Sequence, residues 1–320
     1  MAAVDVLQVI APGILSTVQD LGRYGYGRYG VAPSGALDGF ALRAANLIVG
    51  NREDEACLET TLMGLTVRAL ADVVVAVTGG NLQPRLNRNP LEMWRSYVIG
   101  KGDVLTFSGP ATGFRAYVAL GGGILVPEVL GSRSTSLFSG FGGFCGRMFQ
   151  KDDILAATDP DKYLNAAGRC LQPEWIPAYP TRWTLRVLWG PQDHHFTDEG
   201  RQAFCSGPYL LSSDSDRTGI RLQGPAVYTR SDVAESIISE GVITGAIQVP
   251  GDGQPIIILG ETVTGGYRKI ATVISADLAL LGQMKPGDTV QFRVVSPAEA
   301  AQALRKEEKR IQSFKKSLPG

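Results

Sequence analysis

The 320-residue sequence has only four cysteines and two histidines, which limits the sites it can form. The cysteines lie far apart and form no C-x-x-C pair: Cys57, Cys145, Cys170 and Cys205. With only His194 and His195 to supplement them, we expect no zinc site built from Cys and His. A disulfide framework is typical of much smaller secreted chains. We therefore predict isolated thiols in a reducing compartment and no metal site.

The chain also lacks an excess of either charge and any long apolar run. Its 31 basic residues balance 31 acidic ones, which argues against a nucleic-acid partner or an acidic lipid surface. No apolar run approaches the roughly 20 residues that span a bilayer. The opening MAAVDVLQVIAPG is too short and too polar for a signal peptide. We expect a soluble cytoplasmic protein that binds neither nucleic acid nor membrane.

Several common catalytic motifs are missing as well. The sequence contains no phosphate loop of the form G-x-x-x-x-G-K-[ST] and no G-x-S-x-G elbow. GGGILV follows a strand-like run but lacks the G-x-G-x-x-G opening of a dinucleotide-binding helix. The adjacent histidines of GPQDHHF could supply one general base, because His titrates near neutrality. We favour the simpler interpretation of a turn with one exposed ring.

Glycine and proline are abundant, at 39 and 18 residues, and they separate short apolar runs. Five of these runs are expected to be strands: 73–77, 116–120, 185–189, 255–259 and 289–295. Many short strands between turns indicate a barrel or sandwich. The length predicts two domains, and the polar, proline-bearing segment 159–183 is the expected linker.

Two segments have helical periodicity. Residues 35–51 place five apolar side chains on one face, before a helix-ending Gly50: Leu37, Ala41, Ala44, Ala45 and Ile48. The second segment, 296–316, opens with a capping box formed by Ser296 and Glu299. Its apolar stripe follows: Ala300, Leu304, Ile311 and Phe314. We expect this second helix to be structural.

A short pattern recurs in GKGDVLTF (100–107), QKDDIL (150–155) and KPGDTVQF (285–292). Each copy places Lys and Asp in a tight turn just before an apolar strand. The repetition suggests related β-units in the two halves of the chain.

Five loops combine glycine with charged residues, at 17–38, 130–147, 213–225, 239–255 and 262–271. Glycine lets backbone N–H groups approach an anion or a planar amide closely. Arginine adds the fork geometry that suits a carboxylate. Five such loops in one chain predict a polar binding cleft.

Taken in order, these segments resemble the biotin-dependent carboxyltransferase family, which includes the C subunit of 5-oxoprolinase, allophanate hydrolase subunit 2 and the Kip antagonist protein. The resemblance begins with PGILSTVQDLGRYGYGRYGVAPSGALDGFALRAANLIVGN. It continues through LETTLMG, VTGGNL, AYVALGGGILVPEVLGSRST, GPQDHHF, SDRTGIRLQGP, GAIQVPGDGQPIIIL and TGGYRKIATVISADL. It covers residues 5 to about 295 and is more specific for the family than for the substrate.

The resemblance implies a mainly β fold with a few helices and two cyclophilin-like β-barrel units, at 5–165 and 183–295, followed by a C-terminal helix at 296–320. It implies the C subunit of an ATP-dependent 5-oxoprolinase that converts 5-oxoproline to glutamate and is inactive alone. The expected partners are the KipI-like B subunit of 5-oxoprolinase and its LamB/YcsF-like A subunit. Two alternatives remain. One is a carboxyltransferase half acting on urea or another amide, and the other is a non-catalytic Kip antagonist that sequesters a kinase inhibitor.

The implied cofactors are ATP, used by the complex, or carboxybiotin carried by another polypeptide. This chain has no A-M-K-M biotinylation motif, and GQMKPGD around Lys285 is interpreted as a turn. Family members often carry D-x-Q-T-T-G-G-Y-P, whereas Gly260 and Thr262 stand here in place of the Asp and Gln. Glu261 can replace the missing acid.

The candidate site residues follow from the loops and the resemblance together. For catalysis we expect Asp38, Glu59 and Asp252 in acid–base work and Lys269 beside a developing anion. For substrate binding we expect Gln19, Asp20, Arg23, Ser34, Arg133, Arg217, Gln248, Thr264, Gly265, Gly266 and Tyr267. Arg23 or Arg217 would hold a substrate carboxylate. The opening segment, 17–38, would line the cleft or contact the partner polypeptide, and it leads into a helix N-terminus that favours anions.

Overall fold

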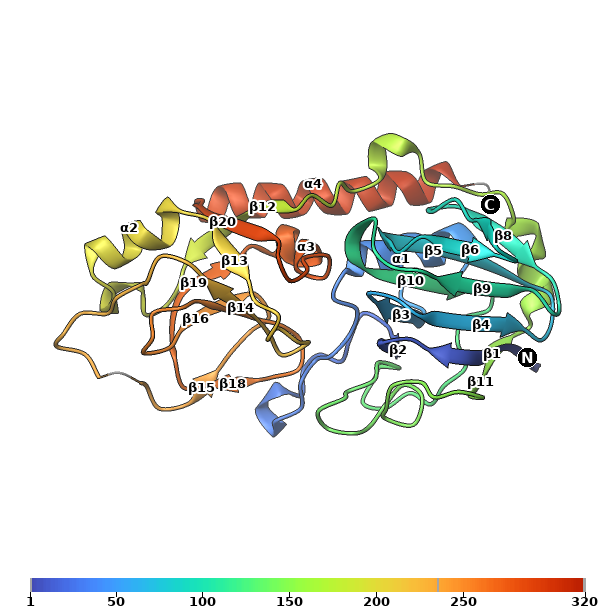
Figure 1. Ribbon diagram of the computed structural model, residues 1–320, viewed down its shortest axis with the longest axis horizontal. Helices are drawn as coiled ribbons and strands as arrows, with labels where there is room; N and C mark the ends of the chain where they lie inside the picture. Colours follow the sequence, from blue (N-terminus) through green and yellow to red (C-terminus); the bar gives the residue numbers. More distant parts are fainter. Residues whose placement is uncertain (1, 235, 319–320) are drawn as a thin grey trace. The chain divides into compact units, whose positions relative to one another are not determined.

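A computed structural model describes residues 2–234 and 236–318, which fall into two compact units. The first unit contains Met1–Tyr24, Ser34–Tyr179 and Lys309–Gly320, and the second contains Gly25–Pro33 and Pro180–Glu308 (Figure 1). This division differs from the predicted one in two places. Residues 25–33 join the second unit, where Gly27 lies next to Val263, and the C-terminal helix is shared between the units. Both differences arise because the units are defined by which residues are in contact in space, not by their order in the sequence.

Two antiparallel sheets build the first unit. The first sheet has the order β11-β1-β4-β9-β6-β7: β11 (Ile154–Thr158), β1 (Ala3–Pro12), β4 (Leu65–Ala69), β9 (Val104–Phe107), β6 (Pro84–Leu86) and β7 (Asn89–Pro90). The second has the order β2-β3-β10-β5-β8: β2 (Leu15–Gln19), β3 (Cys57–Thr61), β10 (Thr112–Leu120), β5 (Val73–Asn81) and β8 (Ser96–Ile99). Both sheets contribute side chains such as Val67 and Val75 to one buried core. Helix α1 (Gly39–Val49) packs on β5 and β10, where Thr78 donates a hydrogen bond to the Ala41 carbonyl at 2.7 Å.

The second unit contains a closed barrel. Its strands follow the order β12-β19-β16-β17-β14-β13-β20: β12 (Arg182–Trp189), β19 (Arg268–Val273), β16 (Ala246–Val249), β17 (Ile256–Ile258), β14 (Gly219–Gln223), β13 (Tyr209–Leu211) and β20 (Thr289–Val294). The ring closes through parallel pairing of β12 with β20, which are far apart in the sequence. A separate ribbon pairs β15 (Glu240–Gly241) with β18 (Thr264–Gly265). Phe204 of α2 (Asp198–Ser206) stacks on Phe292 of β20, with ring centroids 4.4 Å apart.

These observations confirm the mainly β fold class. Each of the five predicted strand runs coincides with an observed strand and extends at most one residue beyond it: β5, β10, β12, β17 and β20. The closed ring belongs to the second unit, whereas the described strands of the first form two sheets over a shared core. The remaining elements are short: η1 (Gly27–Tyr29), η2 (Pro160–Ala166), η3 (Pro173–Trp175), η4 (Asp193–His195), η5 (Ser275–Asp277) and α3 (Leu278–Leu281).

Both predicted helices form, but α1 begins only at Gly39, so Leu37 precedes the helix on whose apolar face it was predicted. Helix α1 stops at Gly50, whose φ of 85° is left-handed and favours glycine. Helix α4 (Pro297–Ser317) begins with the predicted capping box, because the Ser296 N–H donates to Glu299 Oε2 at 2.7 Å and the Glu299 N–H donates to Ser296 Oγ at 3.3 Å. Within residues 2–234 and 236–318, no helix has the length and apolarity that a bilayer crossing requires.

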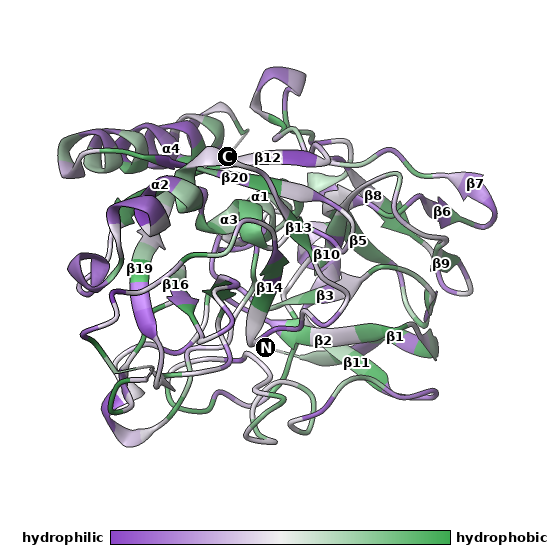
Figure 2. Ribbon diagram, turned by 60° about the vertical axis from the view of Figure 1, so that its left-hand side comes forward, coloured by the Kyte–Doolittle hydropathy of each residue, from purple (hydrophilic) through white to green (hydrophobic). Residues whose placement is uncertain are grey.

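The apolar stripe of α4 is only partly as predicted. Ile311 and Phe314 are buried, but Leu304 is 46% exposed, so its assignment to the buried stripe was wrong. The last turns of the helix belong to the first unit, where Phe314 meets Trp175 edge to face at 5.9 Å between ring centroids. Figure 2 shows hydrophilic and hydrophobic residues mixed along α4 and a hydrophilic β7.

The recurrent Lys–Asp pattern adopts one turn geometry in all three places. The carboxylate of the Asp accepts a hydrogen bond from the backbone N–H three residues earlier, at 2.8, 2.7 and 3.2 Å: Gly100 to Asp103, Gln150 to Asp153, and Lys285 to Asp288. The residue before each Asp has a positive φ: Gly102, Asp152 and Gly287. The copies precede β9, β11 and β20, so the predicted turn before a strand is confirmed in both units.

Replacing Phe314 by Ala is expected to destabilise the first unit by about 3 kcal/mol or more, because it leaves a cavity beside Trp175. Leu304→Ala on the same helix is the matched control and should change stability by less than about 0.5 kcal/mol, because Leu304 is largely exposed. Urea unfolding followed by circular dichroism compares the two. Equal losses would show that α4 is not anchored through Phe314.

Candidate functional site

One candidate region lies in the first unit, where a row of polar side chains crosses the sheet β2-β3-β10. Strand register places Thr17 and Tyr117 on either side of Glu59, all on one face. Arg115, two residues before Tyr117, lies 3.9 Å from Glu59 between Nε and Oε1. These four side chains are buried, which is unusual for polar groups unless they satisfy one another.

The Tyr117 hydroxyl connects the two predicted acids of this unit. It donates to Glu59 Oε2 at 2.7 Å and accepts from the Asp38 N–H at 2.8 Å. Asp38 in turn caps α1, accepting from the Ala41 N–H at 2.9 Å, and accepts from the Tyr179 hydroxyl at 2.8 Å. The structure therefore brings Asp38 and Glu59 into a single buried network.

Both tyrosines of this network remain protonated. Burial, together with the neighbouring carboxylates, raises the pKa of Tyr117 well above its usual value. The pKa of Tyr179 is raised in the same way by burial and by Asp38. Each hydroxyl is thus a fixed donor to a carboxylate at neutral pH.

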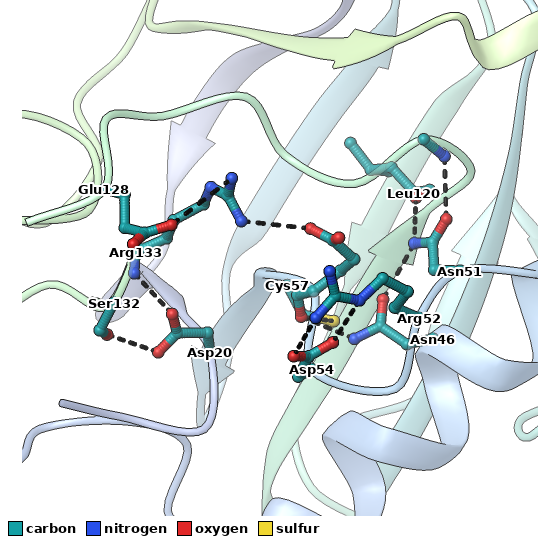
Figure 3. Close-up of polar contacts among 12 residues, drawn as sticks. Asp20, Asn46, Asn51, Arg52, Asp54, Cys57, Leu120, Glu128, Ser132 and Arg133 are labelled. Carbon is teal, nitrogen blue, oxygen red and sulfur yellow. Dashed lines mark hydrogen bonds and ion pairs between the residues drawn. The ribbon is translucent and has the colours of Figure 1, made fainter. Parts of the chain in front are cut away.

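Asp20 has its carboxylate enclosed by the loop at 132–134 (Figure 3). Its Oδ1 accepts from the Ser132 and Ser134 hydroxyls at 2.6 and 2.5 Å, and its Oδ2 accepts from the Arg133 N–H at 2.5 Å. The Arg133 guanidinium points away toward Glu55 and Glu128, at 3.4 and 4.0 Å. Asp20 therefore holds the loop in place, and Arg133 lies among surface carboxylates.

Three further predicted site residues, Arg23, Gln19 and Ser34, are also buried in this unit. The buried Arg23 donates from Nη2 to the Ser134 carbonyl at 2.5 Å and lies over the Phe141 ring. Gln19 donates to the Thr135 carbonyl at 3.2 Å. Ser34 is buried with a φ of 53°, next to Gly35. A Cβ at Gly35 would lie 2.9 Å from the backbone of Gly22, so these opening-segment glycines allow close backbone contact.

A second candidate region, in the second unit, surrounds Lys269 at the start of β19. Its Nζ forms an ion pair with Glu240 of β15. Gln192 joins both residues, because its Nε2 donates to Glu240 Oε1 at 2.6 Å while its Oε1 accepts from the Lys269 N–H at 3.0 Å. Hydrogen bonds from Lys269 and then Gln192 lower the pKa of Glu240. The buried Lys269 ammonium group is therefore paired with a Glu240 carboxylate that stays ionised.

The glycine-rich stretch before Lys269 surrounds Gln248. The Gln248 side chain donates to the Tyr267 carbonyl at 3.3 Å, and a Cβ at Gly265 would lie 2.2 Å from its Nε2. A side chain at position 265 would therefore displace the Gln248 amide from this position. Gly266 lies against Ser239 and Ile237, whereas Thr264 and Tyr267 are exposed: these two side chains are the accessible ones of the stretch.

The remaining two predicted residues lie elsewhere in this unit. Arg217 is buried in an ion pair with Glu261, with Nε and Oε1 3.4 Å apart. Asp252 is in an exposed turn, where it accepts from the Gln254 N–H at 3.0 Å. The structure places Asp252 in none of the networks described above.

Sequence reasoning missed several residues of these networks, chiefly Tyr117, Gln192, Glu240 and Arg268. The signal for Gln192 was the GPQDHHF segment, whose histidines were considered as a general base but for which a turn with one exposed ring was favoured. Its backbone does form the short turn η4, but His195 Nδ1 also accepts a hydrogen bond from Arg268 Nε at 3.1 Å. Throughout the described part of the chain, no group of three His, Cys, Asp or Glu side chains could hold a metal ion, and all four cysteines are free thiols.

Comparison with known proteins identifies the family. The family model described as "Carboxyltransferase domain, subdomain A and B" matches residues 29–294, and the chain belongs to this family. It is 38% identical over 298 residues to the 5-oxoprolinase C subunit of Escherichia coli (strain K12), covering 93% of this chain and 94% of that protein. Identity to the 5-oxoprolinase C subunit of Haemophilus influenzae is 34% over 306 residues, covering 95% of each.

Solved structures give the same family relationship. The K. lactis urea amidolyase superposes with a TM-score of 0.92 at 32% identity, over 98% of this chain and 20% of that much longer chain. TTHA0988 superposes with a TM-score of 0.79 at 33% identity, over 91% of this chain and 55% of that one.

Replacing Tyr117 by Phe is expected to cost about 1–3 kcal/mol of stability, because it removes the acceptor of the buried Asp38 N–H and one of the two donors to Glu59 Oε2, the other being the Leu37 N–H at 3.1 Å. Tyr24→Phe is the control and should be nearly neutral, because Tyr24 is 73% exposed. Urea unfolding of both variants measures the difference. A neutral Tyr117→Phe would show that this hydroxyl does not hold the network together.

Proposed function

We propose that this chain is the C subunit of an ATP-dependent 5-oxoprolinase complex that converts 5-oxoproline to glutamate. One observation carries the proposal: the C subunit of E. coli aligns with 93% of this chain and 94% of its own length at 38% identity. An alignment that spans most of both sequences supports a shared role in the complex. The urea amidolyase, in contrast, contains this region as about a fifth of a longer polypeptide.

The partners we propose are the KipI-like B subunit of 5-oxoprolinase and its LamB/YcsF-like A subunit; without them the chain is inactive. The two polar regions described above lie in different units, and each is built around residues that are already paired. A reaction that needs further groups would obtain them from these partners.

Opening a lactam requires an amide carbonyl made more electrophilic and a proton for the departing nitrogen. ATP supplies the activation, by phosphorylating the amide oxygen. In the second unit, Lys269 is already paired with Glu240 and Arg217 with Glu261, so these two cations do not fit a triphosphate. We therefore assign ATP binding to another polypeptide of the complex.

Lys269 is the residue of this chain that we propose acts beside the substrate. Glu240 and Gln192 hold it in one position, and its side chain retains slight exposure at the start of β19. A cation fixed in this way stabilises negative charge developing on the carbonyl oxygen without reorganising during the reaction. Asp38 and Glu59 shape the first unit through the Tyr117 network.

A second candidate is a carboxyltransferase half that acts on urea or another amide, favoured by the TM-score of 0.92 to urea amidolyase. Carboxybiotin would have to come from another polypeptide. Lys285, the residue nearest to a biotinylation motif, has its Nζ bound to Asp288 Oδ1 at 2.8 Å within a turn and does not fit a biotin attachment site.

The decisive experiment is co-purification with the two partners, followed by measurement of ATP-dependent glutamate release from 5-oxoproline. Lys269→Met should lower kcat by about 10²-fold, as loss of a charge-stabilising donor does. Lys306→Met, on an exposed face of α4, is the control and should retain activity. Full activity of Lys269→Met would remove Lys269 from the reaction. Carboxybiotin-dependent amide carboxylation in place of glutamate release would favour the second candidate.

A further inference from the structure

Arg268, the first residue of β19, is a buried cation that no described carboxylate neutralises. Its side chain is 3% exposed. Among residues 2–234 and 236–318 it forms no ion pair, and its Nη1 has no hydrogen-bond partner. A buried charge that is not neutralised is costly, and such costs are concentrated where a protein does chemistry. Its Nε donates a hydrogen bond to His195 Nδ1, at 3.1 Å.

The backbone around this pair is tightly packed. The Gly190 N–H donates to the Ile270 carbonyl at 2.8 Å, and the Lys269 N–H donates to the Gln192 side chain at 3.0 Å. A Cβ at Gly190 would lie 2.3 Å from the Lys269 carbonyl oxygen, so only glycine allows this approach. The loop that carries His195 is thereby held against the strand that carries Arg268, so their contact is a fixed feature of the second unit.

The Arg268 contact determines where the His195 ring carries its proton. A guanidinium only donates, so Nδ1 must accept with its lone pair and the proton lies on Nε2. Burial and the nearby charges of His194, Arg268 and Arg230 lower the pKa of His195, against a smaller opposing effect of Asp232. At neutral pH the ring is therefore uncharged, with Nε2–H available as a donor.

We propose that Arg268 is a positioning residue that fixes His195 as a neutral Nε2–H donor, and that this N–H binds the carbonyl oxygen of the amide substrate. The inference rests on the proposed function for its substrate class. A neutral imidazole donates a hydrogen bond to a developing oxyanion without having to release a proton, which suits activation of an amide carbonyl.

The tautomer can be tested on the intact chain without partners. Because the sequence has only two histidines, nitrogen NMR of isotope-labelled histidine resolves His195 with His194 as the internal reference. We expect His195 as the Nε2–H tautomer with a lower pKa than His194. Arg268→Met should raise the pKa of His195 and mix its tautomers, whereas Arg268→Gln, which keeps an N–H donor, should preserve the tautomer if the Met variant does not fold. A protonated or Nδ1–H His195 in the wild type would overturn the proposal.

The donor role is tested in the reconstituted complex. His195→Ala should lower kcat by about 10²-fold with little change in KM, because the lost hydrogen bond strengthens as charge develops. His195→Gln, which presents an amide N–H near the Nε2 position, should restore most of that loss, and His194→Ala should stay within about two-fold of wild type. Equal losses for the Ala and Gln variants, or none for Ala, would overturn the donor role. A wild-type complex that releases no glutamate would refute the proposed function, while the NMR result would still decide the tautomer.

Discussion

The hydroxyl of Tyr117 is the contact on which the first unit depends. It joins the carboxylate of Glu59 in a central strand to the backbone of Asp38 at the start of α1. Asp38 then holds Tyr179, the last residue before the chain enters the second unit. Because buried carboxylates are tolerated only when their hydrogen bonds are satisfied, sheet, helix and connecting segment are constrained together.

The second unit contains three buried cations in different surroundings. Lys269 is compensated by Glu240 and Arg217 by Glu261, whereas Arg268 meets the neutral ring of His195. Arg268 and Lys269 lie in β19 and Arg217 just before β14, both strands of the closed barrel. The uncompensated charge of Arg268 thus lies in the region that we propose acts on the substrate. Proteins depart from the rules that favour stable folding mainly at functional sites, and this arrangement agrees with that expectation.

Local features of the fold were predictable because their causes are local. The capping box at Ser296, the left-handed Gly50 and the three Lys–Asp turns each involve residues within four positions of one another. Leu304 was wrongly predicted because periodicity shows which face of α4 is apolar, while burial depends on which part of that face meets another element. Gly265 was expected to offer its N–H to a ligand, which stays a prediction, and the structure adds that its missing side chain leaves room for the Gln248 amide.

By itself, the sequence determined the family, the mainly β class, the strand runs and the helix ends, since apolar periodicity and turn residues act over short distances. Only the tertiary structure decided what the candidate side chains contact. Asp20 is enclosed by a loop more than a hundred residues away, and Arg268 meets His195 across 73 positions, so neither environment can be inferred from neighbours in the chain. The opening glycines likewise owe their role to the backbones they meet on folding, because a close approach exists only once both segments are in place.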